Sequence, residues 1–285
     1  MAKVLVVGCG NLGSGLAKEL VSAGHIVTAI RRTGTEFPDK VTGITGDVLT
    51  LKNEHLPDAD MIFLIMTPRT RSEEDYQQAY LFTAQRLIDR YHASTVQPKI
   101  FFVSSTSVYG QNNGELLTEQ QPALPNSATA KVLLAVEIGL SERLPTTSIR
   151  FSGIYGGNRL RLIEQAQQQE EWPANRWTNR IHRDDCIRVL AFLANAHHQG
   201  QTLESIYIAT DSVPVSLWEV KLWIATSLGV ASNLPINESA SAFIPISGKR
   251  LSNQRLCKLG FRFLYSSYSM GYAESLMRYV PCKEK

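Results

Sequence analysis

VLVVGCGNLG, residues 4–13, is a short apolar run followed by three glycines in the spacing GxGxxG. The run Val4–Val7 is typical of a strand that is buried on both faces of a parallel sheet. After it, Leu12, Leu16 and Leu20 recur at helical spacing, so the sequence predicts a helix directly behind the glycines. A strand, a glycine-rich turn and a helix in this order are the context in which GxGxxG indicates a dinucleotide-binding turn.

The glycines and the helix start suit a pyrophosphate group. Gly8 permits a tight turn, Gly10 lets the backbone approach the phosphates, and Gly13 allows the helix to pack closely on the strand. Asn11 and Leu12 belong to the first turn of the helix, whose free N–H groups and positive dipole end attract anions. The alternative is a glycine-rich turn that only packs, and the flanking strand and helix favour the binding turn.

Two adjacent basic residues follow the second predicted strand, His25–Ile30. NAD-specific proteins place an acidic residue near this point, where it accepts a hydrogen bond from the ribose 2′-hydroxyl. Arg31 and Arg32 stand there instead, and guanidinium groups can bind a 2′-phosphate through charge-assisted hydrogen bonds. We therefore predict NADP as the cofactor, with NAD left open. The alternative is a pair of solvated surface arginines.

Strand and helix signals alternate along the first half of the chain, as expected for parallel strands joined by crossover helices. We predict an α/β fold, a Rossmann-type doubly wound parallel sheet with a smaller mixed C-terminal substrate lobe. The dinucleotide-binding domain is expected over residues 1–155 and the lobe over 156–285, with elements near 177–215 returning to the first domain. Further strands are expected at Val41–Thr45, Met61–Met66, Ile100–Ser104, Thr147–Phe151 and Ser205–Ala209, and helices at Glu73–Tyr91, Ala128–Arg143, Asp184–Ala196 and Leu217–Leu228.

The composition is that of a globular protein with a sizeable core. Of 285 residues, 44% are hydrophobic and 19% are charged, and the net charge is only +3. Neither a long basic run nor a long apolar run occurs, so nucleic acid and a membrane are not expected as partners. Four cysteines at wide, irregular spacings predict reduced thiols in the cytoplasm rather than disulfides, and no metal site is expected.

Several further segments, in this order, resemble the short-chain dehydrogenase/reductase superfamily. The likeness is to an atypical member of its NAD-dependent epimerase/dehydratase family, and it covers most of the chain. The spacing GxGxxG is itself typical of atypical members. The segments are GDV at 46–48, TP at 67–68, VSSTSVYG at 103–110, RFSGIYGGNR at 150–159 and IHRDD at 181–185.

The resemblance implies a role for a residue in each of these segments. Asp47 and Val48 would contact the adenine, and Thr67 with Pro68 would approach a cofactor ribose. The family's catalytic serine or threonine, five residues before the glycine of the VYG segment, corresponds to Ser105. Lys131 would hold the nicotinamide ribose, or it is a solvated helix lysine. Residues implied beside the nicotinamide and the substrate are Phe151 and Gly153.

One catalytic position departs from the family pattern. The family's YxxxK pair would place a tyrosine four residues before Lys131, where this chain has Ser127. A serine hydroxyl does not ionise near neutral pH, so Ser127 cannot act as the acid/base without a separate base. Tyr109 and Tyr155 are candidate substitutes, although packing roles are the alternative for each.

Two functions are consistent with these residues, and a pure scaffold is the least favoured reading. The first is an NADP(H)-dependent oxidoreductase or epimerase/dehydratase that acts on a carbonyl, an alcohol or a sugar-nucleotide-type small molecule. The second is a non-catalytic NADP(H)-binding protein that reports redox state to a partner. The segment around Ser105 favours catalysis, whereas Ser127 favours the sensor. A homodimer is left open.

Overall fold

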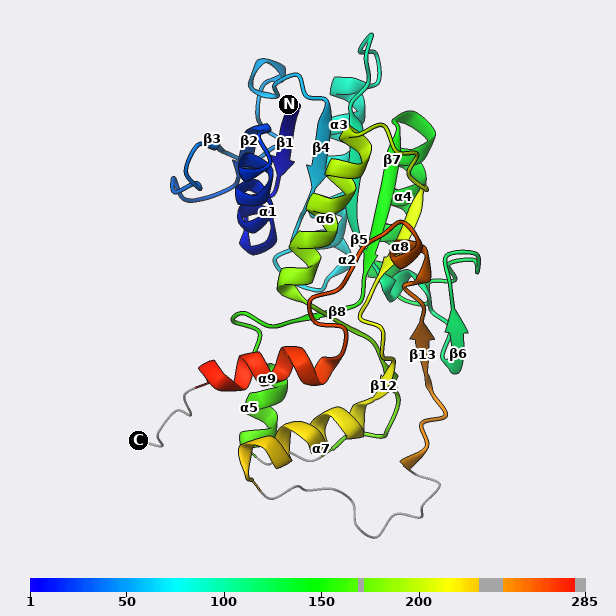
Figure 1. Ribbon diagram of the computed structural model, residues 1–285. Helices are drawn as coiled ribbons and strands as arrows, with labels where there is room; N and C mark the ends of the chain where they lie inside the picture. Colours follow the sequence, from blue (N-terminus) through cyan, green and yellow to red (C-terminus); the bar gives the residue numbers. More distant parts are fainter. Residues whose placement is uncertain (169–171, 231–242, 280–285) are drawn as a thin grey trace. The chain divides into compact units, whose positions relative to one another are not determined.

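A computed structural model describes residues 1–168, 172–230 and 243–279 of the chain (Figure 1). The chain forms two compact units, and both are discontinuous in sequence because the chain passes between them several times. Unit 1 consists of Met1–Gly110, Pro122–Phe151 and Cys186–Tyr207. Unit 2 consists of Gln111–Gln121, Ser152–Asp185 and Ile208–Lys285.

A seven-stranded parallel sheet with the order β3-β2-β1-β4-β5-β7-β11 forms the centre of unit 1. The order reverses between β1 and β4, which is the switch point of a Rossmann-type doubly wound sheet. This confirms the predicted fold class. The strands are β1 (Lys3–Val7), β2 (Ile26–Arg31), β3 (Thr42–Thr45), β4 (Met61–Leu64), β5 (Lys99–Ser105), β7 (Thr146–Phe151) and β11 (Ile206–Ala209).

Helices cover both faces of this sheet, with α1 (Asn11–Ser22) and α6 (Arg183–His198) on one face (Figure 1). On the other face lie α3 (Thr83–Tyr91) and α4 (Ala128–Arg143). The central strands are buried from both sides, as the apolar run at the start of the sequence predicts: Leu5 and Val6 are inaccessible to solvent. Short 3₁₀ turns, η1 (Asn53–His55) and η3 (Thr106–Val108), lie in the connections.

The helix expected over residues 73–91 is present, but it is not a regular α-helix. It begins as α2 (Glu73–Tyr76), continues as the π-helical turn η2 (Gln77–Phe82) and resumes as α3. Tyr80, within the π-helical turn, packs its ring against Phe102 of β5. A π-helical turn holds more residues than an α-helical turn, and the sequence periodicity does not reveal it.

Unit 2 contains a mixed four-stranded sheet, a two-stranded sheet and four helices among its described residues. Its core joins α5, α7 and α9 through Ile163, Val220, Ile224 and Tyr272. The strands are β6 (Asn113–Leu117), β8 (Gly153–Tyr155), β9 (Trp177–Thr178), β10 (Arg180–His182), β12 (Val215–Ser216) and β13 (Gly248–Leu251). The helices are α5 (Arg161–Gln167), α7 (Leu217–Leu228), α8 (Gln254–Lys258) and α9 (Tyr268–Arg278).

Local chemistry sets the ends of α7, the helix that the sequence places at these same bounds. The Ser216 hydroxyl accepts a hydrogen bond from the Glu219 amide at 3.1 Å, and Gly229 ends the helix in the left-handed conformation at φ 68°. Within the described part of the chain, no helix combines the length and the apolar character needed to cross a membrane.

Candidate functional site

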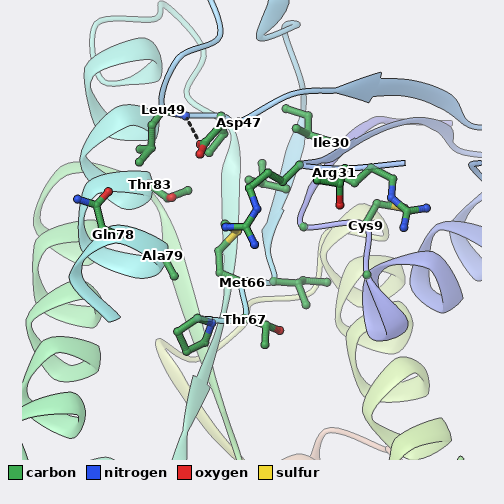
Figure 2. Close-up of a pocket in the computed structure, with 18 of the residues that line it drawn as sticks. Cys9, Ile30, Arg31, Asp47, Leu49, Met66, Thr67, Gln78, Ala79 and Thr83 are labelled. Atoms are coloured by element: carbon green, nitrogen blue, oxygen red, sulfur yellow. Dashed lines mark hydrogen bonds between the residues drawn. The ribbon is translucent and has the colours of Figure 1, made fainter. Parts of the chain in front are cut away.

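Unit 1 contains a cavity of about 670 Å³ at the carboxyl ends of β1, β2 and β4 (Figure 2). This is the edge at which doubly wound sheets bind ligands, beside the reversal of strand order. The fold brings together eight residues that the sequence analysis proposed separately. They are Gly8, Gly10, Arg31, Arg32, Asp47, Val48, Thr67 and Pro68.

The three positions of the turn are glycine for different structural reasons. Gly8 adopts φ 104°, and a Cβ there would lie 1.9 Å from the Ile65 carbonyl oxygen. A Cβ at Gly13 would lie 2.2 Å from the Gly8 carbonyl oxygen. By contrast, a Cβ at Gly10 would meet no described atom within 4 Å, and Gly10 lines the cavity. Gly8 and Gly13 are therefore required by packing, whereas Gly10 leaves space that a ligand can use.

Helix α1 begins directly at this space. Gly10 is its N-cap residue, and the first turn, with Asn11, Leu12 and Gly13, carries no acidic side chain. A helix start without a capping side chain presents backbone N–H groups and the positive end of the dipole to an anion. The turn itself is held by β2, because the Gly8 and Cys9 amides both donate to the Ile30 carbonyl, at 3.0 and 2.8 Å.

Arg31 and Arg32 both line the cavity, but their surroundings differ. The Arg31 guanidinium donates to the Glu36 carbonyl at 2.6 Å and lies 5.9 Å from the centre of the Phe37 ring. Arg31 therefore holds the loop that follows β2. The Arg32 side chain is exposed, and within the described ranges it makes no hydrogen bond or ion pair. Arg32 is thus the arginine available to an anionic ligand.

The wall beside Asp47 includes residues that sequence reasoning missed. The Asp47 carboxylate accepts a hydrogen bond from the Leu49 amide at 3.0 Å, which orients it. Figure 2 shows Gln78, Ala79 and Thr83 coming from one helix on the side of the cavity near Asp47. These residues lie in a long helix without a motif, so no sequence signal marked them. Arg69, which follows Thr67 and Pro68, also lines the cavity.

The residues proposed for catalysis in unit 1 lie at element ends. Ser105 ends β5, and its hydroxyl accepts a hydrogen bond from the Ser107 amide at 3.1 Å. Ser127 is the N-cap of α4, and its hydroxyl accepts from the Ala130 amide at 3.3 Å. Lys131 lies one turn further on and is exposed. Ser127 therefore has a local structural role, because a serine caps a helix and a tyrosine does not.

Tyr109 is fully buried, and its ring lies 4.8 Å from the guanidinium carbon of Arg150. Arg150 in turn forms a two-pronged ion pair with Glu137 of α4, with Nη2 at 2.5 Å from Oε2, and Ser104 donates to the same carboxylate. Phe151, at the end of β7, is also buried. This network ties β5, α4 and β7 together and gives Tyr109 the environment of a packing residue.

Tyr155 belongs to unit 2, where its ring stacks on Tyr272 with the centroids 4.5 Å apart. Burial raises the pKa of the Tyr155 phenol well above its ordinary value, and the nearby Asp211 carboxyl adds to the rise. At neutral pH Tyr155 is therefore a neutral phenol that is difficult to ionise.

A second cavity, of about 450 Å³, lies within unit 2 and is strongly basic. Gly153 and Tyr155 line it, and the Lys221 and Arg180 side chains there are only 2% and 6% exposed. Arg180 donates to the Thr178 hydroxyl at 2.6 Å, and the Lys221 ammonium lies 5.5 Å from the Trp172 ring centre. The basic residues that line this cavity are Arg159, Arg161, Arg176, Arg180 and Lys221. Such a set of cations suits an anionic ligand.

Asp211 should make the stability of the protein depend on pH. Its backbone amide donates to the Arg180 carbonyl. Burial raises the pKa of its carboxyl from 3.8 to about 7, although the Val213 amide and Arg180 oppose the rise. The folded state therefore binds this proton more tightly than the unfolded chain, so the free energy of unfolding falls as pH rises from about 4 to about 7. The free energy of unfolding should fall by at most about 1.4 kcal/mol for each pH unit in this range. We expect Asp211→Asn to remove this pH dependence. Urea unfolding of both proteins at pH 5 and pH 8 measures it, and an equal pH dependence would contradict it.

Among the described residues, no group of three or more His, Cys, Asp or Glu side chains could hold a metal ion. Of the cysteines that the structure describes, Cys9 and Cys186 are buried and Cys257 is partly exposed, all as free thiols. The charged residues that line the cavity of unit 1 are Arg31, Arg32, Arg69, Asp47 and Asp75, whereas those that line the cavity of unit 2 are all basic.

Comparison with known proteins identifies the family. The model of the NAD-dependent epimerase/dehydratase family matches residues 4–209, which is more than half of the chain. The chain belongs to this family. The chain is 29% identical to the protein YeeZ of Escherichia coli K12, and the alignment covers 93% of this chain and 97% of YeeZ.

Solved structures agree with this assignment along nearly the whole chain. A candidate NAD-dependent epimerase/dehydratase from Methylobacillus flagellatus has a TM-score of 0.81 and 33% identity, and the alignment covers 98% of this chain and 99% of that one. MoeE5, in complex with UDP-glucuronic acid and NAD, shares the fold with a TM-score of 0.75 at 23% identity, covering 97% and 99% of the two chains. The resemblance inferred from the sequence motifs is thereby confirmed.

Proposed function

We propose that the cavity of unit 1 binds NADP(H) and that the protein is an NADP(H)-dependent oxidoreductase or epimerase/dehydratase. The observation that carries this proposal is the convergence at Gly10, where a vacant side-chain position, the start of α1 and the basic end of β2 meet in one cavity. Any such dinucleotide needs space for close backbone approach and free N–H groups for its pyrophosphate, and NADP also needs cations for its 2′-phosphate.

Different lining residues would contact different parts of the dinucleotide. Asp47 and Val48 would hold the adenine, Gly8 and Gly10 with the α1 N-terminus the pyrophosphate, and Thr67 with Pro68 a ribose. A bound nicotinamide supplies the hydride acceptor or donor for a carbonyl or alcohol. Ser105 would hydrogen-bond a substrate oxygen, and Lys131 would hold the nicotinamide ribose hydroxyls.

The preference for NADP over NAD is expected to lie with the two arginines. A charge-assisted hydrogen bond contributes about 1.5–3 kcal/mol, which corresponds to a preference of roughly tenfold or more. Arg32→Ala should remove most of this preference and leave NAD affinity nearly unchanged, because Arg32 has no other partner among the described residues. Arg31→Ala should weaken NADP binding through the loop that Arg31 holds at Glu36.

Calorimetric titration of the wild type and both variants with NADP and NAD measures these effects. The double variant should bind the two cofactors equally. Equal affinities in the wild type would disprove the NADP preference, although the proposed binding of a dinucleotide would stand.

We further propose that the substrate is an anionic small molecule of the sugar-nucleotide type and that it binds in the basic cavity of unit 2. Phosphate groups match the arginines and the lysine that line this cavity. The structurally similar MoeE5 has been observed with UDP-glucuronic acid, which is consistent with this class of substrate. Oxidation or reduction of the bound cofactor in the presence of a panel of carbonyl compounds and sugar nucleotides tests the activity.

A second candidate is a non-catalytic NADP(H)-binding protein that responds to redox state. The specific observation in its favour is that Ser127 caps α4 in place of the family's catalytic tyrosine, while Tyr109 is buried against Arg150. Tight cofactor binding without turnover across the substrate panel would support this second function.

A further inference from the structure

The π-helical turn Gln77–Phe82 lies directly beside the cavity of unit 1. Gln78 and Ala79 of this turn line the cavity, as does Thr83, the first residue of α3. A π-helical turn holds one residue more than an α-helical turn, and such turns occur often at functional sites. The place of this turn in the fold therefore points to a role at the cavity.

Tyr80 is the residue of the turn that reaches the neighbouring strands. Its hydroxyl donates a hydrogen bond to the Met66 carbonyl at 3.1 Å, and its ring meets Phe102 edge-on with the centroids 6.1 Å apart. Burial raises the pKa of the Tyr80 phenol, so the hydroxyl remains protonated and can donate at any physiological pH. The π-helical turn thus connects the helix to the loop that follows β4.

The segment that Tyr80 holds is the wall against which the phosphate turn is built. The Ile65 amide donates to the Val7 carbonyl at 2.8 Å, at the end of β1. The Ile65 carbonyl occupies the space next to Gly8 that any side chain would need, and the Met66 sulfur lies 3.4 Å from the same position. Thr67 and Pro68, which follow immediately, line the cavity. A shift of Met66 would therefore move both the glycine turn and the ribose-binding segment.

We propose that Tyr80 is a positioning residue for dinucleotide binding. Its hydroxyl holds the segment Ile65–Pro68 against Gly8, and the π-helical turn places this hydroxyl within hydrogen-bond distance of the Met66 carbonyl. The proposal rests on the proposed binding of a dinucleotide in the cavity of unit 1. Tyr80 acts through Met66 rather than by touching the cofactor.

The test variant is Tyr80→Phe, which removes the hydroxyl and keeps the ring on Phe102. The same helix provides a matched control in Tyr91→Phe. The Tyr91 hydroxyl also donates to a backbone carbonyl, that of Pro57 at 2.7 Å, but Pro57 does not line the cavity. Because Tyr91 is only 1% exposed, a general loss of stability should be at least as large in the control.

Calorimetric titration with NADP, below the unfolding temperature of every variant, gives the first readout. We expect Tyr80→Phe to weaken NADP binding by about threefold to tenfold, the range of one lost hydrogen bond. Tyr91→Phe should bind as the wild type does. Hydrogen exchange gives the second readout: amides of residues 65–68 should exchange faster in Tyr80→Phe and at the wild-type rate in Tyr91→Phe.

Each outcome bears on the proposal. Unchanged NADP affinity in Tyr80→Phe, or an equal loss in both variants, would overturn the positioning role while leaving dinucleotide binding intact. Failure of the wild type to bind either NADP or NAD would overturn the proposed function, and the positioning role with it.

Discussion

Replacing Gly10 with valine is expected to abolish dinucleotide binding and to leave the protein folded. The Cβ of the valine would enter space that contains no described atom within 4 Å, so the first side-chain carbon meets no obstacle. The backbone φ of Gly10 is −90°, so this position does not need the left-handed conformation that favours glycine. The same side chain would occupy the region where the pyrophosphate must approach the start of α1.

The expected loss of affinity is large. Two charge-assisted hydrogen bonds to phosphate, each of about 1.5–3 kcal/mol, correspond to roughly 100-fold or more. Calorimetric titration with NADP measures the affinity, and circular dichroism with thermal unfolding verifies the fold. Undiminished affinity in Gly10→Val would show that the pyrophosphate does not bind beside Gly10.

The neighbouring glycines provide the contrasting variants. Valine at Gly8 or Gly13 would collide with backbone at 1.9 and 2.2 Å, and Gly8 also needs a positive φ. These two variants should therefore lower the unfolding temperature, whereas Gly10→Val should not. If all three variants unfold alike, the distinction between packing and binding glycines is wrong.

The Ser127→Tyr substitution is expected to produce a measurable gain in carbonyl reduction if Ser127 is the relic of a lost proton relay. It would place a phenol four residues before Lys131, the spacing of the family's acid/base pair. Positioned acid/base groups contribute about 10²–10⁴-fold to rate. The substitution also removes the Ser127 hydroxyl, which accepts a hydrogen bond from the Ala130 amide and caps α4. This loss should lower the free energy of unfolding by about 0.5–2 kcal/mol.

Cofactor oxidation with carbonyl substrates measures the gain, and two variants separate its causes. Ser127→Ala loses the cap without supplying a phenol, so it should lose stability and gain no activity. Adding Lys131→Ala to Ser127→Tyr should abolish the gain. Brisk turnover by the wild type that Tyr109→Phe or Tyr155→Phe abolishes would instead reveal a relocated proton donor, and the sensor function would be wrong.

The sequence by itself determined the features that depend on local spacing. The apolar run Val4–Val7, the glycine spacing and the helical periodicity behind it predict β1, the turn and α1, because each signal lies within a short stretch of chain. Helices α4 and α7 have the predicted bounds at both ends, since capping serines and the residues beyond the helices mark them. The family likewise followed from motifs whose order along the chain is part of the signal.

Only the tertiary structure decided which residues meet and which are free. Arg31 and Arg32 are indistinguishable in sequence and both line the cavity, yet the Arg31 guanidinium is bound to the Glu36 carbonyl, whereas Arg32 makes no hydrogen bond or ion pair within the described ranges. Tyr80 of the π-helical turn contacts Phe102 of β5 and the Met66 carbonyl in the loop after β4, contacts that helical periodicity does not predict. The basic cavity of unit 2 gathers Arg161, Arg176 and Lys221 from three separate segments. Such sites arise from contacts between elements, and neither residue spacing nor periodicity encodes those contacts.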